Sequence, residues 1–361
     1  MACAVTLRTP LMGMRVSPRS VDGRWYAGAG PSAAAPDRQT PLAGTDGLVP
    51  SGAGLRIIEP GLQTLPQDGG RPGLSGQGIG YAGAADRPSL RRANGLVGNA
   101  ELEAALELSM GGFRAEALGT LVLALSGAPR DGRITGPLGE RPAPPDRAFR
   151  LNQGEQLRLG DPLRGMRTIL AMRGGAQLPV VLGSRSRDTL AGVGPAPLSE
   201  GDVILAGAAP RNATGAPVPA EDTLPGEGDE VRLTISFGPR AEWFGEEGRE
   251  RLLGQSWLVT PRSDRVGVRL QGDALVRHEA FRDRELPSEG LVVGSIQVPP
   301  DGQPVLFLAD HPTTGGYPVI AVVSARHLGL IAQLPPGSRV SFVPESSSAP
   351  AEITLRRKNQ R

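Results

Sequence analysis

The chain reads Val305-Leu-Phe-Leu-Ala-Asp-His-Pro-Thr-Thr-Gly-Gly-Tyr-Pro-Val-Ile-Ala-Val-Val323 near its C-terminal end. Two apolar runs in it, Val305 to Leu308 and Val319 to Val323, lack the polar alternation of a half-exposed strand. Both are therefore expected to form strands that are buried on two faces. Between them, Gly315 and Gly316 permit backbone angles that a Cβ would forbid, so the connecting turn can approach a ligand closely.

Three hydroxyl groups lie on this connection, those of Thr313, Thr314 and Tyr317. Residue chemistry alone favours an ordinary loop between two core strands over a ligand site. The ligand-site hypothesis predicts that the turn lines the principal cleft and faces Arg71 and Arg265, which come from other segments. Glycines at a strand-to-strand turn would then serve the close approach of a substrate.

Composition limits the class of protein. The 361 residues include 51 glycines and 35 prolines with only 4% aromatic residues, which is typical of a turn-rich, β-leaning chain. The formal charge of +2 gives no reason to expect a nucleic-acid partner.

One cysteine and three scattered histidines leave no metal-binding pattern. No apolar run reaches the roughly 20 residues that a membrane span needs, and no signal peptide is evident, so we expect a cytoplasmic protein without a membrane partner.

A glycine-rich stretch at residues 67–80 raises the question of phosphate binding. A P-loop needs a lysine followed by serine or threonine, but the chain has one lysine, Lys358. No strand–glycines–helix unit frames the stretch, so the dinucleotide fingerprint fits poorly as well. Within it, Asp68 and Arg71 either hold an anionic group or pair with each other across a turn.

Local patterns predict several elements. Residues 55–65 read as an alternating strand broken by a Pro-Gly turn, and residues 230–237 read as a second alternating strand. Asp86 is expected to cap a helix that ends at Gly98, and Asn99 to cap a short second helix. Prolines and glycines in residues 129–149 predict a long loop.

Several motifs occur together in a fixed order between residues 55 and 345. They are Gln67-Asp-Gly-Gly-Arg71, Ala93-Asn-Gly-Leu-Val-Gly-Asn99, Ser263-Asp-Arg-Val-Gly-Val-Arg-Leu270 and Pro312-Thr-Thr-Gly-Gly-Tyr317. In this the chain resembles the carboxyltransferase subdomain A/B family. That family includes the C subunit of 5-oxoprolinase, the KipA-type partner of KipI and part of urea carboxylase. Ala82 and Thr168 depart from its usual serine and tyrosine, and His311 stands where arginine is common.

The resemblance implies a mostly β fold of two subdomains with a few short helices, the second subdomain being a cyclophilin-like β-barrel. It also implies a strand at residues 106–110 with Glu107 pointing inward. The expected divisions are a disordered extension (1–54), carboxyltransferase subdomain A (55–206), a linker (207–229), subdomain B (230–345) and a basic tail (346–361).

The resemblance also implies a function, that of one component of an ATP-dependent 5-oxoprolinase. Such an enzyme converts 5-oxo-L-proline to L-glutamate together with a KipI-like B subunit and an A subunit, the assembled complex using ATP. The residues expected to be catalytic are Asp68, Arg71, Arg265, Thr314 and Tyr317. Those expected to bind a cofactor are Gln297, Thr313, Gly315 and Gly316, with no metal site.

Two alternatives stay open. The chain can be the carboxyltransferase half of a urea carboxylase type enzyme, with biotin supplied in trans because a single lysine, Lys358, leaves no internal biotinylation site. It can also be a regulator without catalytic activity that antagonises a KipI-like protein.

Arg265 and Arg269 can together hold an anionic group such as a carboxylate, unless Asp264 pairs with one of them.

Overall fold

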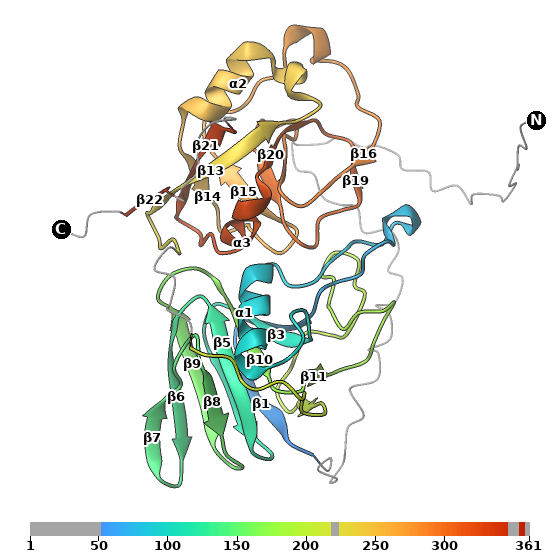
Figure 1. The fold of residues 1–361 in the computed structure, drawn as a ribbon. Helices are drawn as coiled ribbons and strands as arrows, with labels where there is room; N and C mark the ends of the chain where they lie inside the picture. The colour runs from blue at the N-terminus through green and yellow to red at the C-terminus, as the bar shows by residue number, and fades with distance from the viewer. Residues whose placement is uncertain (1–51, 218–223, 346–353, 358–361) are drawn as a thin grey trace, which may run out of the picture. The chain divides into compact units, whose positions relative to one another are not determined.

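The computed structural model describes residues 52–217, 224–345 and 354–357. Its strands form three large sheets and a small two-stranded one (Figure 1). The disordered extension expected for residues 1–54 falls mostly on residues 1–51, which lie outside the described residues. Gly54 already belongs to the first strand. No helix in the described part of the chain is long and apolar enough to cross a bilayer.

The first sheet has seven strands in the order β11-β12-β1-β4-β9-β6-β7. Its strands are β1 (Gly54–Pro60), β4 (Phe113–Ala117), β6 (Arg130–Gly136), β7 (Gly139–Pro142), β9 (Gln156–Pro162), β11 (Ala176–Gln177) and β12 (Val203–Ala206). The prediction of a long loop at residues 129–149 is wrong, because β6 and β7 form a hairpin there. Alternate residues of β6 are buried. Pairing with β7 and burial of one face therefore stabilise this strand despite the low strand propensity of its glycines.

The second sheet has five strands in the order β2-β3-β10-β5-β8. They are β2 (Gln63–Gln67), β3 (Ala105–Ser109), β5 (Leu121–Gly127), β8 (Ala148–Leu151) and β10 (Arg167–Met172). All five residues of β3 are buried, including Glu107, so the strand and inward glutamate expected there are confirmed. A continuous buried strand needs a covering layer, and the helix α1 provides it.

Helix α1 (Arg87–Val97) follows its sequence signals closely. Asp86 caps it by accepting a hydrogen bond from the Ser89 amide at 3.0 Å, and Gly98 ends it in the left-handed conformation. Its buried face carries Leu90, Ala93, Leu96 and Val97 and packs on β5 and β10, with Ala105 of β3 in the same apolar cluster.

No second helix follows, and that expectation is wrong. The side-chain amide of Asn99 donates to the Asn94 side chain at 2.9 Å and to the Met172 carbonyl at 2.8 Å. Asn99 therefore ties the end of α1 to β10 and does not cap a helix. The residues that follow it form turns as far as β3.

The third sheet closes into a barrel. Its order is β20-β17-β18-β15-β14-β21-β13, and β13 pairs back to β20, so seven strands form a ring with β22 added beside β13. The strands are β13 (Glu230–Phe237), β14 (Trp257–Val259), β15 (Gly267–Gln271), β17 (Ser295–Gln297), β18 (Val305–Phe307), β20 (Val319–Val323), β21 (Arg339–Pro344) and β22 (Thr354–Arg356). The mostly β fold with a barrel is thus confirmed, and Thr354–Arg356, expected within a tail, form a strand.

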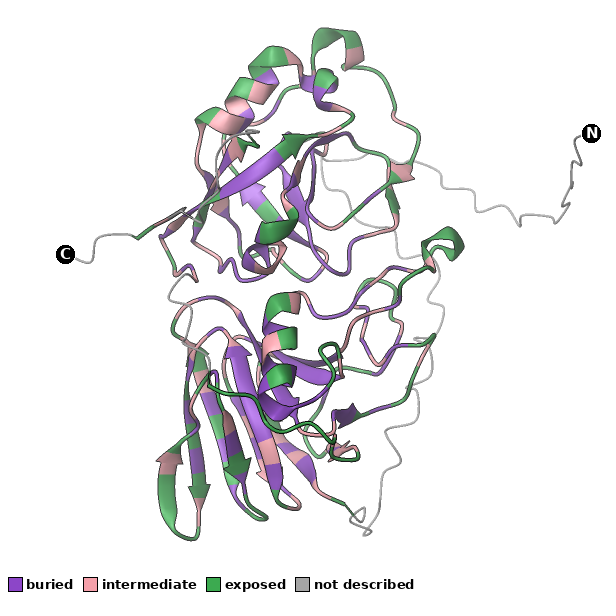
Figure 2. Ribbon diagram, viewed as in Figure 1, coloured by how far each residue is buried: buried purple, intermediate pink, exposed green. Residues whose placement is uncertain are grey.

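Few helices accompany the barrel. The described residues contain α2 (Gly245–Gly254), the short α3 (Leu328–Ile331) and four single 3-10 turns, η1 (Ser75–Gln77), η2 (Ala241–Phe244), η3 (Glu279–Phe281) and η4 (Ala325–His327). Strands β16 (Glu289–Gly290) and β19 (Thr314–Gly315) form the small sheet. Figure 2 shows buried residues gathered on the barrel strands, whereas most residues of α2 are exposed or half-buried. The barrel core includes Trp257, Phe342 and Ile320.

Two sets of strands share this chain without mixing. Residues 54–206 build the first two sheets, and residues 230–356 build the barrel. Residues 207–217 and 224–229, between the two sets, contain neither helix nor strand. Helix α1 of the first set contacts α3 of the second, and the candidate site lies beside this contact.

Candidate functional site

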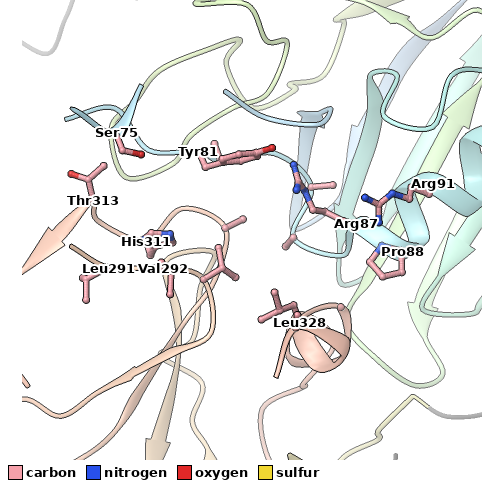
Figure 3. A pocket seen from close by; sticks show the side chains of 17 residues that line it. Ser75, Tyr81, Arg87, Pro88, Arg91, Leu291, Val292, His311, Thr313 and Leu328 are labelled. Carbon is pink, nitrogen blue, oxygen red and sulfur yellow. The ribbon is translucent and has the colours of Figure 1, made fainter. Parts of the chain in front are cut away.

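A cavity of about 430 Å³ lies between residues 75–91, which include the start of α1, and residues 291–329 of the barrel (Figure 3). That volume is within the usual range of small-molecule sites. Its walls are mainly small and apolar, with a few polar groups. The polar lining residues are Ser75, Tyr81, Arg87, Arg91, His311 and Thr313, and no aspartate or glutamate of the described residues lines it.

Arg87 and Arg91 make one side of this cavity cationic. Both belong to the first turns of α1, four residues apart, so they lie on the same helix face. The Arg87 guanidinium lies over the Tyr81 ring at 4.6 Å from its centroid and donates to the Gly69 carbonyl. Arg91 is more exposed and pairs with Glu101 at 3.4 Å. Arg87 is therefore the arginine held in a defined orientation at the cavity wall.

The start of α1 is fixed from the barrel. Gln333 donates from its side-chain amide to the Asp86 carboxylate at 2.6 Å and to the Arg167 carbonyl at 2.8 Å. Burial raises the pKa of Asp86, although hydrogen bonds from Gln333 and Ser89 oppose that rise. The N-cap of the helix that carries Arg87 is thus anchored to the residues that follow α3.

His311 lies on the opposite side of the cavity from Arg87 (Figure 3). Its side chain is buried, and its Nδ1 lies 2.7 Å from the Pro312 carbonyl oxygen. The Phe307 ring packs against it with centroids 6.1 Å apart. The imidazole is therefore held in one orientation by a hydrogen bond and a ring contact.

The backbone at Ala82 and Gly83 shapes the cavity edge. Ala82, a lining residue, has φ of +51°, which is uncommon for a residue with a side chain. Gly83 has φ of +87°, and a Cβ there would lie 2.9 Å from the Gly70 amide. A serine, which the family resemblance led us to expect at position 82, would place a hydroxyl on this wall, whereas Ala82 makes the wall more apolar.

Behind the cavity lies a buried ion network. Arg265 pairs with Glu107 of β3 and, at 2.9 Å, with Asp310, and it donates to the Gly83 carbonyl at 2.6 Å. Burial lowers the pKa of Arg265, but the charges of Glu107 and Asp310 outweigh it and raise that pKa overall. A second arginine, Arg167, lies 3.6 Å from Glu107, and burial lowers its pKa.

This network positions both walls of the cavity. The other oxygen of Glu107 accepts from the amide of Ala85, a lining residue, at 2.8 Å. Asp310 directly precedes His311 and accepts from the Thr189 amide and hydroxyl at 2.9 and 2.6 Å. Arg265 is thus bonded to groups beside both walls, and its guanidinium is occupied by protein partners.

The residues expected from the sequence do not converge as predicted. The Asp68 carboxylate accepts from the amides of Gly70 and Arg185 and the hydroxyls of Ser184 and Ser186, at 2.5–2.8 Å. It therefore organises a loop and makes no ion pair with Arg71. Arg269 is exposed while Arg265 is buried, so these two arginines do not form a joint anion site.

Arg71 is also engaged within the protein. Its buried guanidinium donates to the carbonyls of Val181 and Ser186, and burial lowers its pKa. One of its terminal nitrogens, Nη1, is buried with no hydrogen-bond partner among the described residues. Arg71 is not a lining residue of the cavity, so the turn that carries Thr314 does not face it there.

The Thr-Thr-Gly-Gly-Tyr turn is divided between two environments. Thr313 lines the cavity, whereas Thr314 and Gly315 form β19 and pair with β16. Gly316 and Tyr317 are exposed, Tyr317 by 44%. Gln297 donates from its side-chain amide to the Tyr317 carbonyl at 3.0 Å and so holds the turn in place. The catalytic and cofactor roles assigned to these residues stay predictions.

Sequence reasoning missed Arg87 and Tyr81. Their signal was present, since Arg87 directly follows the helix cap Asp86 and Tyr81 lies six positions before it. An arginine at the first position of a helix is unusual, because its charge opposes the helix dipole unless an anion is nearby.

Comparisons with known proteins agree with this architecture. Residues 77–344 match the model of the carboxyltransferase domain, subdomain A and B. The chain belongs to this family. A relative from Escherichia coli K12, the C subunit of 5-oxoprolinase, is 36% identical over 292 residues, which cover 80% of this chain and 90% of the relative.

Other members of the family are longer proteins. The urea amidolyase of Lachancea kluyveri is 31% identical over 81% of this chain, which matches 17% of that protein. The crystal structure of TTHA0988 superposes with a TM-score of 0.72 at 34% identity, covering 82% of this chain. This chain spans about half (56%) of the TTHA0988 chain. The family domain therefore occurs both by itself and joined to other domains.

Proposed function

We propose that this chain is the C subunit of an ATP-dependent 5-oxoprolinase, which opens the lactam of 5-oxo-L-proline to give L-glutamate. The observation that carries the proposal is the charge of the cavity. Arg87 and Arg91 face it, and no carboxylate of the described residues lines it, so it suits a small anion. The correspondence with 90% of the E. coli C subunit supports this substrate over others.

The substrate carboxylate would bind at Arg87. Its guanidinium is held by the Tyr81 ring and the Gly69 carbonyl, so little freedom is lost when an anion binds. The lactam ring would then occupy the apolar part of the cavity, against Leu291 and Leu328. In this arrangement the lactam group points away from Arg87, toward the wall that carries His311.

The nucleotide would be bound by the partner proteins, a KipI-like B subunit and an A subunit. The described residues of this chain contain no lysine, so they offer no P-loop for a triphosphate. In the glycine-rich loop, the Gly70 amide donates to Asp68, and the Gly78 amide donates to the Ser75 carbonyl at 3.0 Å. These two amides are used within the loop and are not free to bind a phosphate.

A second candidate function is the carboxyltransferase half of a urea carboxylase type enzyme, acting on biotin supplied by another protein. The similarity to urea amidolyase favours it. The same cavity would then hold a carboxylated group near Arg87. The two functions differ in the cofactor that they require, since 5-oxoproline opening needs ATP and no biotin carrier.

Reconstitution tests the proposal. The chain is mixed with its A and B partners, and glutamate release from 5-oxoproline is measured with ATP. Omitting the chain should abolish release, and Arg87→Met should raise the KM by about 10- to 100-fold, as expected for the loss of a charged hydrogen bond. Arg56→Met, at a surface ion pair with Glu116, is the control and should leave the KM unchanged.

Two outcomes would overturn it. One is undiminished glutamate release without this chain. The other is transfer of a carboxyl group from a carboxylated biotin carrier, with no glutamate formed from 5-oxoproline, which would establish the carboxyltransferase function.

A further inference from the structure

The tautomer of His311 follows from one contact. Its Nδ1 lies 2.7 Å from the Pro312 carbonyl oxygen, and a carbonyl oxygen can only accept a hydrogen bond. Nδ1 therefore carries a hydrogen and donates it. In the neutral ring, the other nitrogen, Nε2, then has no hydrogen and presents a lone pair.

This lone pair has no partner within the protein. Among the described residues, the side chain of His311 makes one hydrogen bond, the one from Nδ1. The residue is only 8% exposed and lines the cavity, so Nε2 has little access to water except through the cavity itself. Nε2 is open to the cavity, so a ligand that fills the cavity without supplying a donor would leave this acceptor unpaired, at a cost.

The two sides of the cavity are therefore complementary to different ligand groups. Arg87 and Arg91 offer donors and positive charge on one side, and His311 offers an acceptor on the other (Figure 3). A simple anion without a hydrogen-bond donor, such as sulfate, would satisfy the arginines alone. A ligand that satisfies both sides carries an anionic group and a separate N–H donor. In 5-oxoproline the carboxylate is on C2 of the ring and the N–H is on the neighbouring ring nitrogen.

We infer that His311 is a specificity-determining residue whose Nε2 accepts a hydrogen bond from the N–H of the ligand. The inference rests on the proposed function and deepens it: the cavity selects a lactam carboxylate over the corresponding lactone carboxylate. In the lactone, a ring oxygen replaces the N–H and presents lone pairs to the lone pair of Nε2. Two acceptors facing each other in an apolar cavity repel, so the lactone is rejected.

The test compares 5-oxoproline with its ring-oxygen analogue, 5-oxotetrahydrofuran-2-carboxylate, as competing ligands of the reconstituted complex. The wild-type complex should bind the lactam at least about tenfold more tightly than the lactone, as expected for one buried hydrogen bond. His311→Asn retains a side-chain amide that can donate to the Pro312 carbonyl but has no acceptor at the position of Nε2. In this variant, the preference should fall to about twofold or less.

His311→Gln is the matched control, because its amide oxygen can reach the position of Nε2 and accept a hydrogen bond. It should keep most of the preference for the lactam, whereas a purely structural role for His311 would make both variants alike. Melting temperatures of the free chain, measured for both variants, establish that each is folded.

The possible results separate this inference from the proposed function. If 5-oxoproline binds and Arg87→Met weakens it, but His311→Asn keeps the wild-type preference, the inference is wrong and the proposed function stands. Equal affinity of the wild-type complex for lactam and lactone would likewise show that the inference about His311 is wrong, while the proposed function stands. Failure of 5-oxoproline to bind at all overturns both.

Discussion

Arg265 and Glu107 form a buried ion pair across 158 positions of sequence, one on the loop before β15 of the barrel and the other in the middle of β3. Both side chains are at most 2% exposed. Charges placed so deeply are costly unless every group has a partner, and here Asp310 and the Gly83 carbonyl complete the set around Arg265. The pair therefore joins the barrel to the β-sheets and fixes the two walls of the cavity relative to each other.

Removing the charge of Glu107 should destabilise the fold strongly. Glu107→Gln keeps the shape of the side chain but leaves Arg265 and Arg167 with an excess of buried positive charge. We expect a loss of about 3–5 kcal/mol in the free energy of unfolding, measured by urea denaturation.

The surface pair of Arg56 and Glu116 provides the control for that measurement. Their side chains are 40% and 30% exposed, so Glu116→Gln should cost less than about 1 kcal/mol. A cost for Glu107→Gln as small as that of the control would show that the buried network contributes little to stability.

The sequence predicted those elements whose signals are local. The strands at residues 230–237 and 319–323 have the predicted bounds, because apolar pattern and turn residues agree there. The cap and the end of α1 follow from Asp86 and Gly98 in the same way. Residues 130–142 were misassigned because their strands gain stability from pairing with β9, which is not visible in a local pattern.

The candidate site was less predictable, and Arg265 shows why. Its motif marks it as an unusual arginine, but whether such an arginine binds a ligand or a protein carboxylate depends on what lies next to it. Its partner Glu107 is far away in sequence, so local reasoning cannot find it. Arg87 was missed for the converse reason: a positive charge at the start of a helix is a local signal, but only the fold shows that Arg87 lies opposite His311 at the cavity.

The hydroxyl of Thr314 is expected to be dispensable. Thr314 is exposed, pairs with Gly290 through its backbone and does not line the cavity. Thr314→Val should therefore leave the kcat/KM of the reconstituted complex within about twofold of wild type and leave the melting temperature unchanged.

The same substitution at Thr168 gives the contrast. The Thr168 hydroxyl is buried, donates to the Ala128 carbonyl at 2.6 Å and accepts from Arg130 at 2.6 Å. Thr168→Val should lower the free energy of unfolding by about 1–3 kcal/mol, because it leaves buried polar groups unpaired. A large loss of activity in Thr314→Val would restore the catalytic role first assigned to that residue.

His327 should make the stability of the chain depend on pH. Its ring is buried, and Nδ1 accepts a hydrogen bond from the Thr234 amide at 3.1 Å, so the ring is neutral with its hydrogen on Nε2. Burial lowers the pKa of His327, Arg326 lowers it further, and Glu345 opposes both. Protonation of the folded protein would cost the bond to Thr234.

The sign of the effect follows from the lowered pKa. Below the usual histidine pKa of about 6.5, the unfolded chain binds the proton more readily than the folded chain does. The contribution of His327 to the free energy of unfolding is therefore complete above about pH 6.5. It is lost progressively as the pH falls toward the folded pKa, at up to about 1.4 kcal/mol per pH unit.

Urea unfolding between about pH 5 and 8 measures this contribution as the difference between wild type and His327→Asn. The asparagine oxygen can accept from Thr234 but does not titrate, so the variant should lack the slope below pH 6.5. Taking the difference removes the contribution of Asp86, whose raised pKa acts in the opposite sense. His278→Asn, at an exposed histidine, should retain the wild-type slope. An equal slope in wild type and His327→Asn would mean that His327 protonates as easily in the folded chain as in the unfolded one.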